Sequence, residues 1–84
     1  MRILIVEDNA RIAAFLQKGL REEGYVVEVA GDGHAGFEKA TQQGFDAAVV
    51  DVMIPGRDGF QLVRDLRGEG VALPVLMLTA KDRT

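Results

Sequence analysis

Hydrophobic and polar residues alternate along this chain in blocks that predict four strands and three helices. Apolar runs typical of strands cover Arg2–Val6, Tyr25–Ala30, Ala47–Asp51 and Leu73–Leu78. Between these runs the apolar residues recur at helical spacing, which predicts helices over Ala10–Glu23, over His34–Gln43, and from a cap at Asp58 to about Arg67. Residues 1–84 therefore have a βαβαβαβ order, with no repeat, linker or low-complexity tract.

Such an alternation is typical of an α/β fold with a parallel sheet, right-handed crossovers and helices on both faces. The run Ala47–Asp51 has the apolar character of a strand that is buried on both faces. The run Tyr25–Ala30 is interrupted by Glu28, which favours an edge strand. Either Asp8 or Asn9 is suited to cap the first helix.

Composition excludes several classes of function. The net charge of −3 disfavours nucleic acid and anionic membranes as direct partners of this segment. The absence of cysteine removes disulfides, thiolate metal sites and cysteine nucleophiles. No apolar run approaches the roughly 20 residues of a membrane span, and no signal peptide is recognisable at the N-terminus. We therefore expect a cytoplasmic protein.

Acidic residues follow two of the predicted strands. Glu7 and Asp8 come directly after the first strand, Asp51 ends the third, and a hydroxyl residue, Thr79, ends the fourth. The carboxyl ends of parallel strands lie along one edge of a sheet. If the first strand lies between the second and the third, the topological switch point brings Glu7, Asp8 and Asp51 into one crevice.

Three adjacent carboxylates repel one another unless a cation compensates their charge. Mg²⁺ prefers oxygen ligands and is commonly held by carboxylates together with phosphate oxygens. A carboxylate such as Asp51 is also able to act as a nucleophile and form an aspartyl phosphate. The hydroxyl of Thr79 would then donate a hydrogen bond to a phosphoryl oxygen. The pattern thus predicts Mg²⁺-dependent phosphate chemistry.

Each residue also has a purely structural interpretation. Asp8 and Asp58 are suited to cap helices, Glu7 to lie in a solvated loop, and Thr79 to supply a turn hydroxyl. Two other polar residues, His34 and Lys81, we expect to be exposed to solvent and without a functional role.

Three stretches resemble two-component response regulator receiver domains, most closely those of the OmpR/PhoB subfamily. They are Ile3–Asp8, Ala48–Gly59 and Pro74–Ala80, and the resemblance extends from residue 1 to residue 84. It implies a flavodoxin-like doubly wound sheet of strand order 2-1-3-4. It also implies a signalling module rather than an enzyme, with a histidine kinase or a small phosphodonor as the source of the phosphoryl group.

Carried over to this sequence, the resemblance makes Asp51 the phospho-acceptor. Glu7, Asp8 and Asp51 would bind Mg²⁺ together with the backbone carbonyl of Met53, and Asp8 would be the more direct ligand of the first two. Thr79 would be the switch hydroxyl. DNA would be contacted only through a domain outside this chain.

The family pattern continues with a further helix, strand and helix that residues 1–84 do not match, so we expect an incomplete receiver domain. The family's phosphate-binding lysine and the aromatic partner of its threonine have no counterpart, because Lys81 is in the wrong place. An open fourth strand and uncovered apolar surface near the first helix predict self-association or domain swapping. An alternative function is a self-associating interaction fragment without a phosphorylation switch. A haloacid-dehalogenase-type phosphatase is disfavoured because Met53 stands where its second acid belongs.

Overall fold

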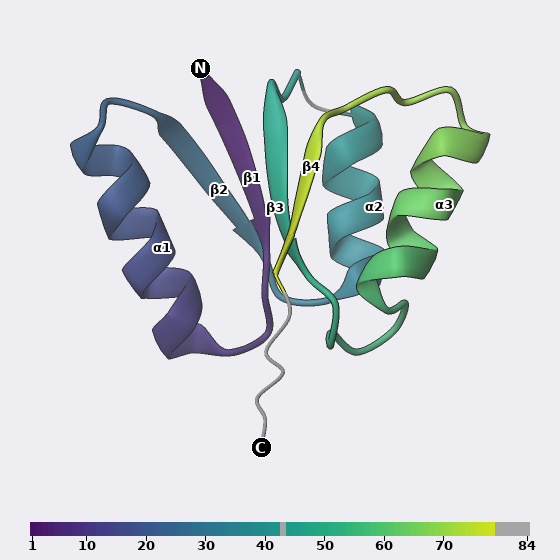
Figure 1. Cartoon of the computed structure of the whole chain (residues 1–84), viewed down its shortest axis with the longest axis horizontal. Helices are drawn as coiled ribbons and strands as arrows, with labels where there is room; N and C mark the ends of the chain where they lie inside the picture. Colours follow the sequence, from purple (N-terminus) through teal and green to yellow (C-terminus); the bar gives the residue numbers. More distant parts are fainter. Residues whose placement is uncertain (43, 79–84) are drawn as a thin grey trace.

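The computed structural model describes residues 1–42 and 44–78, and these contain the predicted elements in the predicted order. The strands are β1 (Arg2–Val6), β2 (Val26–Ala30), β3 (Ala47–Asp51) and β4 (Val75–Leu78), and the helices are α1 (Ala10–Glu22), α2 (Gly33–Gln42) and α3 (Gly59–Gly68). Figure 1 shows the sheet between α1 on one side and the pair α2 and α3 on the other.

The four strands form one parallel sheet of order β2-β1-β3-β4. The predicted flavodoxin-like order is therefore confirmed, and β2 is the edge strand that the sequence indicated. Because the strands are parallel, their carboxyl ends meet at one edge of the sheet, at the bottom of Figure 1. The register places Val6 opposite Val50, so the residues that follow β1 lie level with the end of β3.

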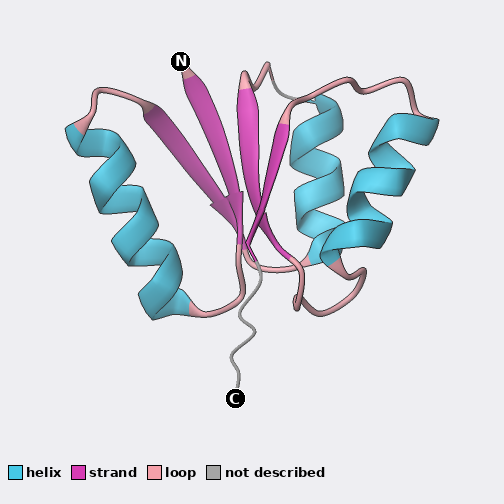
Figure 2. Cartoon of the chain, viewed as in Figure 1, coloured by secondary structure: helices cyan, strands magenta, loops and turns pink. Residues whose placement is uncertain are grey.

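The sheet divides the core into two layers of side chains. Figure 2 shows the strands between helices on both sides. Successive residues of β1 point to opposite faces: Leu4 and Val6 pack on the side of α2 and α3, whereas Ile3 and Ile5 pack on the side of α1. The larger layer is closed by the buried α3 residues Leu62 and Leu66. The other layer depends on a single helix.

That asymmetry corrects the prediction that β3 is buried on both faces. Ala48 and Val50 are buried, but Ala47 and Val49 on the opposite face are only partly covered. The reason is that α1 packs mainly against β1 and β2, so that within the described residues no helix covers this face of β3 and β4. Leu76 of β4 is accordingly 63% exposed.

The helices begin and end at residues suited to those positions. Asn9, rather than Asp8, caps α1, because its Oδ1 accepts hydrogen bonds from the N–H groups of Arg11 and Ile12. Asp58 caps α3 as predicted, accepting from the N–H of Gln61 at 2.8 Å. The side chain of Asp8 is therefore not needed for capping. In the described part of the chain, no helix has both the length and the apolar character needed to cross a membrane.

Candidate functional site

Three carboxylates meet at the carboxyl edge of the sheet. Glu7 and Asp8 follow β1, and Asp51 ends the neighbouring strand β3. Each contributes one carboxylate oxygen to a group whose members all lie within 4.8 Å of one another. The structure thus brings together the three acids that the sequence placed at one edge. We call them the acidic cluster.

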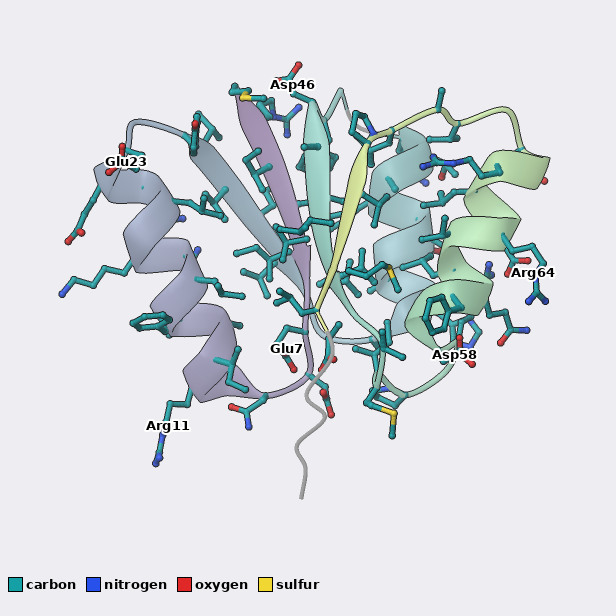
Figure 3. All side chains as sticks on the ribbon, in the orientation of Figure 1. Glu7, Arg11, Glu23, Asp46, Asp58 and Arg64 are labelled. Atoms are coloured by element: carbon teal, nitrogen blue, oxygen red, sulfur yellow. The ribbon has the colours of Figure 1, made fainter. Side chains whose placement is uncertain are left out.

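Two members of the acidic cluster are buried. Glu7 is 4% exposed and Asp51 is 7% exposed, whereas Asp8 is exposed. The interpretation of Glu7 as a solvated loop residue is therefore wrong. Its N–H donates to the carbonyl of Ala30 at 3.0 Å, which continues the pairing of β1 with β2 by one residue and keeps Glu7 inside the sheet edge. Figure 3 shows Glu7 at this end of the sheet and Asp46 at the opposite end.

Burial of Glu7 has an electrostatic consequence. Desolvation raises the pKa of the Glu7 carboxyl above its ordinary value of 4.5, and the nearby charge of Asp51 raises that pKa further. A hydrogen bond from the N–H of Asn9 to Oε2 of Glu7, 3.0 Å long, opposes the shift. Within the described residues, no lysine or arginine forms an ion pair with the acidic cluster. In the described part of the chain, the acidic cluster therefore combines buried negative charge with no ion pair to a lysine or arginine side chain.

The loop after β3 is held against Asp51 by its own backbone. The N–H of Met53 donates to Oδ1 of Asp51 at 3.2 Å, which places the Met53 backbone beside the acidic cluster. The Met53 side chain itself is 71% exposed. Its predicted role as a carbonyl ligand stays a prediction.

Gly59 is a site residue that sequence reasoning missed. A Cβ atom at this position would lie 2.7 Å from the carbonyl oxygen of Asp51 and 2.9 Å from Cα of Val52. The N–H of Gly59 also donates to the carbonyl of Val52 at 2.9 Å. From the sequence, Asp58 is expected to be a cap and Gly59 belongs to a stretch that resembles receiver domains, but nothing in the sequence indicates the close contact across the loop.

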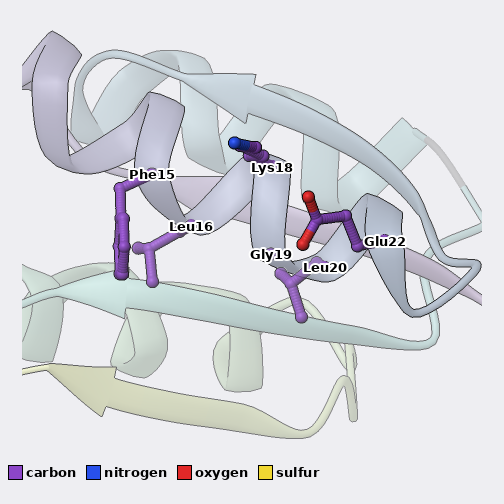
Figure 4. A pocket seen from close by; sticks show the side chains of 6 residues that line it. All are labelled: Phe15, Leu16, Lys18, Gly19, Leu20 and Glu22. Carbon is purple, nitrogen blue, oxygen red and sulfur yellow. The ribbon is translucent and has the colours of Figure 1, made fainter.

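Other predicted residues lie away from the acidic cluster or outside the described residues. Thr79, Ala80 and Lys81 belong to the latter group, so the predicted switch hydroxyl is not described. His34 is exposed, as expected. An apolar hollow lies along α1 and is separate from the acidic cluster (Figure 4); its lining residues are Phe15, Leu16, Lys18, Gly19, Leu20 and Glu22.

The acidic cluster fits a hard divalent cation. Its ligand atoms are carboxylate oxygens, which Mg²⁺ prefers, and two of the three carboxylates are buried without a cationic partner in the described part of the chain. Taken together, fold and cluster define a class: an α/β protein with a doubly wound parallel sheet and an oxygen-donor acidic site at the switch point between β1 and β3.

Comparison with known proteins narrows this class to a family. Residues 3–84 match the response regulator receiver domain, and the chain belongs to this family. The family predicted from the sequence is therefore confirmed.

A curated relative extends the comparison to a longer protein. The transcriptional regulatory protein PcoR of Escherichia coli is 46% identical over 81 residues, which are 96% of this chain but 36% of PcoR. The chain therefore spans about a third of the length of this relative.

Two solved structures are also similar. The receiver domain of Francisella response regulator 1452 superposes with a TM-score of 0.92 and is 32% identical, and the match covers 99% of this chain and 69% of that one. TrrA from Thermotoga maritima, solved in complex with Mg²⁺-BeF, has a TM-score of 0.90 and 30% identity, over 96% of this chain and 70% of that one. These likenesses confirm the predicted fold.

Proposed function

We propose that this chain is the phospho-accepting receiver module of a two-component response regulator, with Asp51 as the acceptor. One observation carries the proposal: Asp51 is a buried carboxylate at the end of a core strand, and its oxygen lies within 4.8 Å of oxygens of Glu7 and Asp8. Nothing in the packing of β3 requires a charged residue there. A carboxylate next to two others is, however, suited to bind a metal and to attack a phosphorus atom.

Four residues would hold Mg²⁺: Glu7, Asp8, Asp51 and Met53, the last through its backbone carbonyl. Asp8 would be the more direct ligand of the first two, since it is exposed and not engaged in capping α1. A bound Mg²⁺ supplies positive charge that offsets the negative charge of the phosphoryl group. The Mg²⁺-BeF complex of the similar protein TrrA supports this assignment.

The chain's own residues orient the acceptor. The N–H of Met53 donates to Oδ1 of Asp51 and so restricts rotation of the carboxylate that attacks the phosphorus. A phosphohistidine of a histidine kinase is the proposed donor. The new P–O bond forms as the P–N bond breaks, the electron pair stays on the donor nitrogen, and this nitrogen takes a proton from water. Thr79 is the proposed hydroxyl donor to the transferred group.

The proposed role in the cell is transcriptional regulation, because PcoR is named a transcriptional regulatory protein. DNA would be contacted by a part of the parent protein outside these 84 residues. No feature of the described residues favours the alternative of an interaction fragment without a switch. Self-association of the 84-residue polypeptide is a separate proposal, which the exposure of Leu76 on β4 and of Phe15 on α1 supports.

Phosphorylation of the intact polypeptide tests the proposed function. With acetyl phosphate and Mg²⁺, mass spectrometry is expected to detect the gain of one phosphoryl group, and chelation of Mg²⁺ should prevent it. The variant Asp51→Asn should lose the gain. The matched control Asp46→Asn, at the opposite end of the sheet, should retain it. An equal gain in wild type and Asp51→Asn would rule out Asp51 as the acceptor.

A further inference from the structure

The Arg57 side chain joins the loop after β3 to both helices on that face of the sheet. Its guanidinium carbon lies 4.1 Å from the ring centroid of Phe37 in α2. Its Nη1 donates to Oδ2 of Asp65 in α3 at 2.8 Å, and its Nε donates to Nδ1 of His34 at 3.4 Å. With 23% of its side chain exposed, Arg57 is well covered for an arginine. None of these partners belongs to the acidic cluster.

The backbone around Arg57 is equally constrained. The carbonyl of Pro55 accepts a hydrogen bond of 2.9 Å from the N–H of Gly33, the first residue of α2. A Cβ atom at Gly33 would lie 2.5 Å from the carbonyl oxygen of Arg57, so only glycine allows this approach. Gly56 has a φ of +86°, a conformation that side chains other than glycine rarely adopt, and the His34 ring packs against it.

The same loop begins at the acidic cluster. Its first residues are held by two hydrogen bonds, from Met53 N–H to Asp51 and from Gly59 N–H to the carbonyl of Val52. The exposed Met53 side chain contributes no anchor in the core. The conformation at Met53 therefore depends on the residues that fix the loop. Ile54 is buried in the core cluster that contains residues of α2 and α3, and the Arg57 side chain adds polar and ring contacts to both helices.

We propose that Arg57 is a positioning residue for the phospho-acceptor site. Through Phe37 and Asp65 it fixes the loop of residues 52–57 so that the Met53 backbone stays against Asp51. The proposal rests on the proposed function in so far as it concerns Mg²⁺. Its structural part, the link between Arg57 and the Met53 N–H, stands without the metal.

Three variants of the 84-residue chain test this link. Arg57→Ala removes every side-chain contact of Arg57. Arg57→Lys keeps the charge but lacks the planar guanidinium group, which is able to stack on an aromatic ring and donate to a carboxylate at the same time. Arg64→Ala is the matched control. Arg64 lies on α3, the helix that Arg57 contacts, and its exposed side chain points away from the rest of the molecule (Figure 3).

Two readouts are needed. Without metal, hydrogen exchange of the Met53 amide should be faster in Arg57→Ala than in wild type and unchanged in Arg64→Ala. In a calorimetric titration with Mg²⁺, Arg57→Ala should bind about tenfold more weakly, as is typical when a residue that supports a metal ligand is lost. Arg57→Lys should lie between wild type and Arg57→Ala in both measurements.

A purely structural role of Arg57 predicts a different result. It would lower the melting temperature while leaving Met53 exchange and Mg²⁺ affinity as in wild type, and that outcome would overturn the proposal. If Arg57→Ala does not fold, Asp65→Asn and Phe37→Leu remove one partner each and should show smaller changes of the same sign. A wild-type chain that binds no Mg²⁺ would contradict the proposed function, whereas the exchange measurement would still decide on Arg57.

Discussion

At the scale of single residues, Glu7 carries the largest electrostatic cost of the acidic cluster. A carboxylate that is only 4% exposed, next to a second buried carboxylate, is unfavourable for a metal-free fold. The hydrogen bond from the Asn9 N–H reduces this cost but does not reverse it, because the pKa of Glu7 stays raised. The metal-free chain therefore carries an electrostatic penalty that a bound cation would remove.

This penalty predicts a pH dependence of stability in the absence of metal. Because the pKa of Glu7 is higher in the folded chain than the ordinary value of 4.5, the folded state binds the proton more tightly than the unfolded state. The free energy of unfolding should therefore decrease as the pH rises from about 4.5 through the raised pKa. Glu7→Gln should remove this decrease and be more stable than wild type at pH 7. Urea denaturation in a chelating buffer at several pH values measures both.

Glu28 provides a control of opposite sign. Its pKa is lowered by the hydrogen bond from Lys39 and further by Arg2, so its contribution is present above the ordinary pKa and is lost at acidic pH. Glu28→Gln should therefore not stabilise the chain at pH 7.

Mg²⁺ should stabilise wild type more than Glu7→Gln. Only the folded state offers the site, and the variant lacks one of its carboxylates. A Glu7→Gln variant that is less stable than wild type in chelating buffer would contradict this account.

At the scale of elements, the position of Asp51 depends on how closely α3 begins beside the end of β3. Gly59 is the first residue of α3, and its missing side chain lets the helix start against the Asp51 carbonyl. The two nearest backbone atoms, 2.7 and 2.9 Å from the position of a Cβ, belong to the strand and loop that carry the site. Backbone at this distance moves only if β3 or α3 shifts.

We expect Gly59→Ala to destabilise the fold by about 1–3 kcal/mol, the range typical of overpacking. Gly19→Ala is the matched control: Gly19 lies inside α1 with no atom within 4 Å of an added Cβ. There the substitution should stabilise by roughly 0.5–1 kcal/mol, because alanine is the better helix former. Denaturant unfolding compares the two. Equal effects of both substitutions would show that the contact beneath Asp51 is unimportant for stability.

At the scale of the whole molecule, apolar surface is concentrated on the face of the sheet that α1 shares. Leu76 is 63% exposed there, and a second hollow on this face is lined by Leu20, Val49 and Leu76, among others. Phe15, 76% exposed, stands at the α1 hollow of Figure 4. In the described sheet β4 pairs only with β3, so its other edge presents unpaired backbone groups.

We therefore expect the isolated polypeptide of residues 1–84 to self-associate through β4 and the adjoining apolar face. Leu76→Lys should shift the population to monomer, because a charge on an edge strand opposes pairing. Val26→Lys, an equally drastic change at a 56% exposed position on the opposite edge strand β2, should leave association unchanged. Sedimentation velocity at rising concentration measures this. A wild-type chain that stays monomeric at high concentration would refute the expectation.

The sequence by itself determined the order of elements, and the resemblance of its motifs to receiver domains predicted the strand order and the family. Periodicity is local, and a helix or a strand shows it without reference to the rest of the chain. The acids at the strand ends could be assigned to one edge because parallel strands end together. With the first strand between the second and the third, this argument placed Asp51 and Glu7 in one crevice, and in the structure a carboxylate oxygen of each lies within 4.8 Å of the other.

Only the tertiary structure decided the features that depend on distances between residues remote in the chain. Glu7 is buried because its backbone continues the pairing with β2. Gly59 matters because a helix begins within contact distance of a strand end, and Arg57 matters because two helices and a loop converge on its side chain. Apolar residues such as Phe15 look alike in the sequence whether or not a neighbour covers them. Whether such a side chain is buried or exposed depends on packing, which is a property of the whole fold.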